Sequence, residues 1–313
     1  MIDLTLTTRD RLKRLTKGLG SPIAPLAAAL LAIGCLLPPG TAKAEAAPEV
    51  AGKPAPEVAA KPAYRLGVFP YLPALTIDRL YGPLAESLSL ELDRLVKLRT
   101  KSTFENFAEA IELQSYDILF VHPFFFVDAV DHHDYLPLAR LDQSLKAILV
   151  ATEDSSTSTL DHLVGQTIGL PPKLAAVSKL IKSALMDEGL RPGLDVGIRH
   201  FRNKASCLQA VGSGAVVACG VPAFILSEIE TFANRPLRTI FEAPPVSHFA
   251  FAIHSRVPEE ERQQLMDLIL AWGQDDDEGI GGFAAGKSFV SIEDADYANI
   301  RAKTTRLQTL AQR

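Results

Sequence analysis

The stretch YDILFVHPFFFVDA, from Tyr116 to Ala129, decides the fold of this chain. Its first half is the near-continuous apolar run that is typical of a strand buried on both faces. After His122 and Pro123 the run continues as an apolar helix. Strands that pass into helices in this way build sheets covered by helices, and ligands bind at the carboxyl ends of such strands. This strand therefore brings a histidine, a proline and three phenylalanines to a place where a ligand site is expected.

The same alternation of strands and helices extends from Tyr64 to the end of the chain. We expect strands at residues 64–70, 96–101, 116–123, 145–153, 166–172, 196–201, 215–221, 237–243 and 248–255. We expect helices at residues 75–92, 103–114, 124–133, 159–165, 175–190, 204–214, 222–233, 258–274 and 294–312. Thr103 is placed to cap the second helix, and Pro258 fits the first turn of a later one. The pattern predicts the α/β class, with a mostly parallel sheet.

The number of strands favours two α/β lobes over one small sheet. We interpret two strand-like segments, 146–153 and 246–255, as crossovers between the lobes. Residues 64–145 and 256–313 would then form lobe one, and residues 154–245 would form lobe two. Because the chain leaves lobe one and later returns to it, the two crossovers predict a two-strand hinge.

Residues 1–44 have the three parts of a secretory signal peptide. A basic start precedes an apolar run over 22–37 and a small-x-small ending at 42–44. The apolar run is short for a membrane span. We expect cleavage after Ala44 and export of the rest of the chain. The alternatives are an N-terminal membrane anchor and lipidation at Cys35, which ends a loose lipoprotein box.

The composition after residue 44 limits which kinds of partner the exported part can bind. Residues 45–63 repeat Ala-Pro-Glu-Val and Lys-Pro and have too few large apolar side chains for a core, so we expect an extended linker. Of the formal net charge of −5, residues 1–44 carry +4, which leaves −9 for the remainder. An acidic chain without a basic stripe is not expected to bind nucleic acid.

The common catalytic and metal-binding motifs are absent from the sequence. It contains no HExxH, GxSxG, Walker or GxGxxG pattern. His132, His133 and Asp134 form a cluster, which we interpret as a solvated helix end, with metal binding as the alternative. The run Asp275–Glu278 lacks the spacing of a calcium loop and is interpreted as a solvated face. We therefore expect no enzyme activity, no metal and no cofactor.

The loops that follow the strands carry the residues that could bind a ligand. Tyr71 lies in FPYLP, where two prolines mark a loop, and the next two strand ends are followed by TKSTF and VHPFFF. In lobe two, LPPKLAAV and RNKASC open helices whose first N–H groups are free to meet an acceptor. The candidate ligand-binding residues are Tyr71, Ser102, Phe104, His122, Phe124, Leu174, Ala175, Ala176 and Lys204.

The chain from about Tyr64 to Tyr297 resembles the phosphate/phosphite/phosphonate type of periplasmic substrate-binding protein. The resemblance is carried by GVFPYLP, YDILFVHPFFFVDA, STLDHLVGQTIGLPP, AVGSGAVVACG and DADYANIR, in that order. It implies the two-lobed, type II periplasmic-binding-protein fold, or Venus flytrap, in which a ligand binds between the lobes. It also implies a periplasmic location and an ABC importer in the inner membrane as partner.

Several positions depart from the pattern of that family. The family usually has glycine where His122 stands, and a histidine where Lys204 stands. The Ser-Thr-Ser-Gly run that holds the oxyanion in phosphonate binders is matched here by Leu174 to Val177, so the N–H groups remain and the hydroxyls do not. An aspartate that holds a ligand amine is matched by Val217. The resemblance therefore implies a more apolar pocket that still favours negative charge.

The three consecutive phenylalanines cannot all line one cleft. A helix turns every ~3.6 residues, so neighbouring side chains point in different directions. We expect Phe124 to face the cleft and at least one of the others to belong to the core. The alternative is that all three are ordinary core residues.

After export only Cys207 and Cys219 remain, and the compartment permits disulfides. Cys207 lies in the first turns of a predicted helix and Cys219 in the strand that follows. A helix start lies near the end of the next strand, so the two residues can approach to the ~5.5 Å that a disulfide needs. We predict a disulfide. Two buried thiols, or a thiol site at the cleft, are the alternatives.

Together these observations predict a monomeric periplasmic solute-binding protein that captures a small ligand between two lobes and delivers it to an ABC importer. The ligand is expected to be an oxyanion or a phosphonate-like molecule. In one alternative the membrane partner is a sensor histidine kinase. In another the ligand is apolar, such as a lipid, because the hydroxyls are missing and three phenylalanines follow His122.

Overall fold

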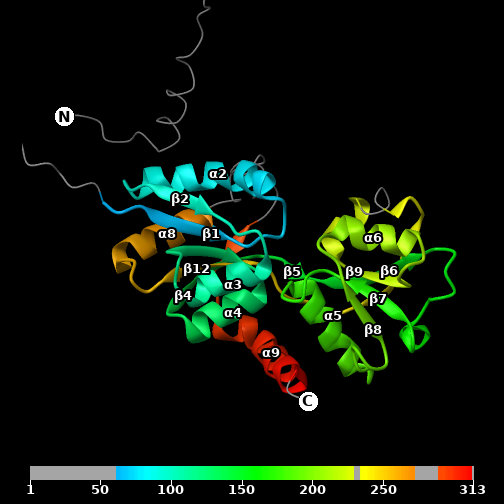
Figure 1. Ribbon diagram of the computed structural model, residues 1–313. Coiled ribbons are helices and arrows are strands. Elements are labelled where there is room, and N and C mark those ends of the chain that lie inside the picture. The colour runs from blue at the N-terminus through cyan, green and yellow to red at the C-terminus, as the bar shows by residue number, and fades with distance from the viewer. Residues whose placement is uncertain (1–60, 229–232, 272–287, 312–313) are drawn as a thin grey trace, which may run out of the picture. The chain divides into compact units, whose positions relative to one another are not determined.

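The computed structural model describes residues 61–228, 233–271 and 288–311 (Figure 1). All of them belong to one compact unit, Val58–Arg313. The expected signal peptide, most of the expected linker and the acidic run at 275–278 lie outside the described residues. Two larger sheets, each with its own helices, make up the described part.

The first sheet contains six strands in the order β13-β4-β12-β3-β1-β2. Their bounds are β1 Tyr64–Val68, β2 Val96–Arg99, β3 Ile118–Val121, β4 Tyr135–Leu141, β12 Ala250–His254 and β13 Phe289–Val290. β1 pairs in parallel with β2 and β3, whereas β12 runs antiparallel to β3 and β4. All four residues of β3 are buried, as its unbroken apolar run predicts. The carboxyl ends of β1, β2 and β3 therefore share one edge of the sheet.

The helices of this part of the chain follow the expected pattern. They are α2 Ala74–Glu91, α3 Phe104–Glu112, α4 Pro123–His132, α8 Glu259–Ala271 and α9 Ala298–Ala311, with a 3-10 turn at Asp294–Tyr297. Thr103 caps α3 as predicted, since its Oγ1 accepts the Asn106 N–H at 3.1 Å. α3 packs on α4, and α9 packs on α4 (Figure 1). None of the helices in the described part is long and apolar enough to cross a membrane.

The second sheet has five strands in the order β10-β6-β9-β7-β8. Their bounds are β6 Ala147–Thr152, β7 Thr167–Leu170, β8 Gly197–His200, β9 Ala218–Pro222 and β10 Leu237–Glu242. The helices that accompany them are α5 Ala176–Asp187 and α6 Lys204–Gly212, with 3-10 turns at Leu160–Leu163 and Ala223–Glu228. β7 is parallel to both β8 and β9, so their carboxyl ends also share one edge.

A disulfide joins Cys207 of α6 to Cys219 of β9, with the two Cα atoms 6.0 Å apart. The prediction is confirmed, and its reason holds: the helix start lies beside the strand that follows it. Both cysteines are fully buried. Gly169 of β7 makes room for this bridge, because a Cβ at that position would lie 2.7 Å from the Cys207 sulfur.

The chain passes between the two sheets beside a short antiparallel ladder. β5, Ser144–Leu145, pairs with β11, Val246–Ser247. The segments interpreted from the sequence as crossover strands, 146–153 and 246–255, contain β6 and β12, which are internal strands of the five-stranded and six-stranded sheets. β5 directly precedes the first segment and β11 opens the second, so the ladder lies where the chain changes sheets.

Candidate ligand-binding site

An aromatic cluster gathers at the carboxyl ends of β1 and β3. Phe69 lies at its centre and is almost fully buried. Its ring centroid is 4.8 Å from Tyr71 in a stacked arrangement, 5.2 Å from His122 and 5.0 Å from Phe249 in edge-to-face arrangements. Phe104, at the start of α3, stacks on His122 at 6.1 Å. Four segments that lie apart in the sequence therefore supply one apolar surface at a sheet edge.

Tyr71 adds a polar group to this surface without adding charge. Its hydroxyl lies 2.8 Å from that of Tyr81 in α2, and one of the two donates the hydrogen bond. Burial raises the pKa of both phenols, which therefore stay protonated. Tyr71 itself is only partly buried, so it combines a fixed hydroxyl with some access from outside.

His122 ends β3 and caps α4. Its Nδ1 accepts the Phe125 N–H at 3.3 Å, so the ring proton of the neutral form lies on Nε2. The ring is 1% exposed and stacks on Phe125 at 4.2 Å. Burial lowers the pKa of His122 far below its usual value, and the nearby charge of Lys179 lowers it further. The histidine is therefore neutral at physiological pH.

The His122 ring lies beside the Leu174 backbone, in the loop between β7 and α5. The Leu174 backbone raises the pKa of His122 and so acts against the effect of burial. In the described part of the chain, the His122 Nε2 atom is buried and has no hydrogen-bond partner. A buried donor without a partner is costly and marks a place where a ligand or water oxygen can be held. His122 thus presents a neutral donor at the point where the two sheet edges approach each other.

The start of α5 forms the other side of this contact. Ala175 and Ala176 are each 7% exposed, as is Val177. Ala175 is the N-cap and has no side chain that could accept the first N–H groups of the helix. These N–H groups therefore remain available to an acceptor, as the sequence predicts.

Lys179 of α5 contacts α4 and so links the two sides of the candidate site. It was not predicted from the sequence. Its ammonium nitrogen lies 4.9 Å from the ring centroid of Phe124, at the start of α4. Burial lowers the pKa of Lys179, while the Asp128 carboxylate of α4 opposes that shift. The signal was present in VSKLIK, where Lys179 falls one turn after the helix start, but an amphipathic helix commonly carries lysines on its solvated face.

The three phenylalanines point in different directions, as the helical period requires. Phe124 meets Lys179, Phe125 stacks on His122, and the Phe126 ring lies 4.4 Å from Tyr297. Of these, only Phe124 is joined by a described ring contact to the second sheet. All three are buried, so the expectation that Phe124 faces the cleft stays a prediction.

Ser102 and Lys204 occupy the margins of the candidate site. Ser102 is exposed, and its hydroxyl accepts a hydrogen bond from the Asn106 side chain at 3.3 Å. Lys204 is the first residue of α6 and is partly buried, with Asn203 as the N-cap. Both lie at the carboxyl ends of strands, as expected, and their roles remain predictions.

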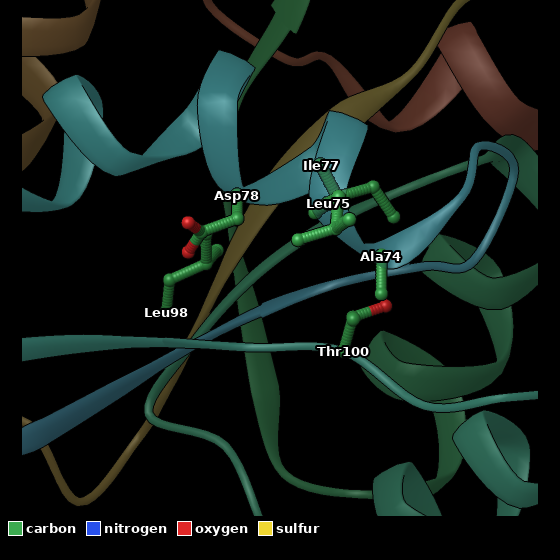
Figure 2. Close-up of a pocket in the computed structure, with 6 residues that line it drawn as sticks. All are labelled: Ala74, Leu75, Ile77, Asp78, Leu98 and Thr100. Atoms are coloured by element: carbon green, nitrogen blue, oxygen red, sulfur yellow. The ribbon is translucent and has the colours of Figure 1, made fainter.

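A cavity of about 260 Å³ opens at the start of α2, beside the end of β2. Figure 2 shows Ala74 and Thr100 at one end of it and Asp78 and Leu98 at the other. The Thr100 hydroxyl is buried and has no hydrogen-bond partner in the described residues. The cavity therefore continues the edge of the first sheet next to the loop that carries Tyr71. No group of three or more metal-ligating side chains occurs in the described residues.

Comparison with known proteins agrees with this architecture. Residues 66–297 match the family model described as "ABC transporter, phosphonate, periplasmic substrate-binding protein". Comparison with curated proteins finds no match. Solved structures of two-lobed binding proteins do match, at low sequence identity.

Three of these structures illustrate the similarity. A binding-protein component of an ABC phosphonate transporter from Pseudomonas aeruginosa has a TM-score of 0.68 at 14% identity, over 79% of this chain and 87% of that one. PhnD1 from Prochlorococcus marinus, in complex with methylphosphonate, has a TM-score of 0.67 at 16% identity, over 79% and 98%. The aliphatic sulphonate binding protein SsuA from Escherichia coli has a TM-score of 0.59 at 12% identity, over 81% and 94%.

The fold is therefore the two-lobed, type II periplasmic-binding-protein fold, and the fold prediction is confirmed. The chain belongs to the family of periplasmic substrate-binding proteins of phosphonate ABC transporters. Proteins of this family bind ligands and are not enzymes, and the family implies a periplasmic location.

Proposed function

We propose that this protein captures a small oxyanion or phosphonate-like molecule between its two lobes and delivers it to an ABC permease in the inner membrane. The proposal rests above all on the unpartnered Nε2–H of His122, which lies beside the uncapped start of α5. A neutral donor from one sheet edge and free N–H groups from the other are suited to an anionic oxygen. Lys179 adds positive charge to the same place.

Closure of the lobes would occur about the β5–β11 ladder. In this ladder Leu145 pairs with Val246 and Ser144 with Ser247, and each strand has only two residues. A short ladder of this kind can absorb backbone rotation while each larger sheet moves as a rigid body. We expect ligand binding to reduce the radius of gyration in small-angle X-ray scattering, and an unchanged value at saturation would contradict closure.

A thermal-shift screen tests the proposed ligand class. The exported protein, expressed from the full chain, would be heated with phosphate, phosphite, methylphosphonate, sulfate or arsenate. A ligand present at a hundred times its dissociation constant stabilises the folded state by about 2.7 kcal/mol. Stabilisation by at least one oxyanion supports the proposal. The mass of the exported protein would report cleavage after Ala44 or lipidation at Cys35.

A second candidate function is transport of an apolar ligand. It is favoured by the cluster of Phe69, Tyr71, Phe104 and Phe249 and by the absence of hydroxyls at Leu174–Val177. The same screen would include sterols, hopanoids and fatty acids. Stabilisation by these compounds alone would favour the second candidate. Binding to a purified sensor-kinase domain instead of the permease would assign the alternative partner.

A further inference from the structure

A group of basic side chains lies at the carboxyl edge of the second sheet, apart from the aromatic cluster. β7 and β8 are neighbours, and Leu170 pairs with His200 at their ends. The His200 Nδ1 lies 2.6 Å from the Pro171 carbonyl oxygen. Because a carbonyl can only accept, Nδ1 must carry the proton, and in the neutral ring Nε2 is left as an acceptor.

Lys182 of α5 reaches back to this acceptor. Its ammonium nitrogen lies 3.3 Å from the His200 Nε2 and donates a hydrogen bond to it. The side chain of a helical residue leans toward the start of its helix, which brings Lys182 to the sheet edge. An ammonium has three donors, so two of them remain after the bond to His200. His200 thus holds the Lys182 ammonium in a fixed place and uses only one of its three N–H donors.

A second lysine adds to the charge at this edge. Lys173, in the loop before α5, lowers the pKa of both Lys182 and His200 by its positive charge, in addition to the effect of burial. Neither Lys173 nor Lys182 forms an ion pair with a carboxylate in the part of the chain that the structure describes. On Lys179, three residues before Lys182, the Asp128 carboxylate raises the pKa and so acts against the effect of burial.

The uncapped start of α5 increases the positive potential. Helix N-termini carry a partial positive charge, and Ala175 has no side chain that could neutralise it. The positive charge of Lys173 acts on Lys182 and lowers its pKa, and a bound anion would relieve that repulsion. Lysine recognises phosphate groups as a point charge with several donors.

We propose that Lys173 and Lys182, with His200 as the residue that positions Lys182, form a subsite for the doubly charged phosphoryl or phosphonyl group of the ligand. The inference rests on the proposed function and specifies its ligand chemistry. At this site ammonium groups replace the hydroxyls that Leu174–Val177 lack. A dianion is preferred over a monoanion because two cations face it.

Calorimetric titration of the exported protein tests the subsite with inorganic phosphate, methylphosphonate and sulfate as probes. Lys182→Gln should weaken binding of phosphate or methylphosphonate by about tenfold to a hundredfold, since one charge-assisted hydrogen bond is lost. Lys173→Gln should weaken it less, because Lys173 is exposed. The matched control is Lys97→Gln, which removes one exposed lysine from β2 of the other sheet and should leave the affinity unchanged.

Two further variants separate positioning from folding. His200→Gln keeps one N–H donor and one acceptor oxygen, so it should retain most of the affinity. His200→Leu removes both and should weaken binding as strongly as Lys182→Gln. A loss that is equal in both variants would contradict a positioning role. If Lys182→Gln does not fold, the exposed Lys173→Gln still provides the test.

The outcomes test this inference separately from the proposed function on which it rests. If the protein binds phosphate or methylphosphonate and Lys182→Gln, Lys173→Gln and Lys97→Gln all bind equally well, the subsite is refuted and the proposed function stands. If the protein binds none of the three anions in the calorimeter, the subsite is refuted, and the proposed function is refuted as well only if phosphite and arsenate also fail to stabilise the protein in the thermal-shift screen. Weaker binding in Lys182→Gln and Lys173→Gln, with Lys97→Gln unchanged, establishes the subsite.

Discussion

Replacement of His122 by asparagine should make the stability of the protein less sensitive to acid. His122 is buried and neutral, and its pKa in the folded protein lies well below the usual value of 6.5. In the unfolded chain the same ring takes up a proton as the pH falls below about 6.5. Below that pH the unfolded state therefore binds more protons, and the folded state loses stability as the pH falls.

The size of the effect follows from linkage. One histidine that stays neutral in the folded state and titrates normally in the unfolded state costs about 1.4 kcal/mol per pH unit once the pH lies clearly below 6.5. Between pH 7.5 and pH 5.5 the contribution of His122 should therefore amount to about 1.4 kcal/mol. Asparagine is a good N-cap that does not titrate, so His122→Asn keeps an acceptor for the Phe125 N–H.

The assay is urea unfolding of the original protein and of His122→Asn at pH 7.5 and pH 5.5. Other groups titrate in both proteins, so only the difference between their pH dependences reports on His122. His132→Asn, at an exposed position at the end of α4, is the matched control. Equal loss of stability in the original protein and in His122→Asn would refute the reasoning, because it would mean that His122 is protonated in the folded state.

Three further predictions concern the disulfide, the C-terminal helix and a glycine. Replacement of Cys207 and Cys219 together by alanine should lower the free energy of unfolding by about 3 kcal/mol, as expected for a closed loop of this length. Urea titration measures this loss. Alkylation of both cysteines without reductant would contradict the bridge. Asp187→Asn removes the carboxylate of α5 that pairs with Arg306 and Lys303 of α9. The free energy of unfolding should fall by about 1 kcal/mol or less at low salt and should not change in 1 M salt. An equal loss at both salt concentrations would show that charge is not the cause. Gly169→Ala should lower the free energy of unfolding by about 1–3 kcal/mol because the added Cβ meets the Cys207 sulfur, and an unchanged midpoint in urea would show that the bridge can move aside.

The order of strands and helices could be read from hydrophobic patterns because the spacing of apolar residues along a segment reflects which of its faces is buried. β3 and its passage into α4 at His122 are the clearest case. β4 was missed, since its leucines alternate irregularly and Pro137 is unusual within a strand. It is held by pairing with β12, which is more than a hundred residues away, and the pairing is bulged at Phe251–Ala252. Such a partner leaves no signal in the local pattern.

Some features of the candidate site could likewise be predicted from the sequence, and others could not. The sequence by itself determined the family, the disulfide and the loops that reach the sheet edges, because strand ends and helix starts are local features. Only the tertiary structure decided which side chains meet there: Lys179 on the ring of Phe124, and Lys182 on His200. A lysine in an amphipathic helix looks the same in sequence whether it faces water or another element. Its surroundings, and with them its charge and its partners, exist only once segments far apart in the chain have packed together.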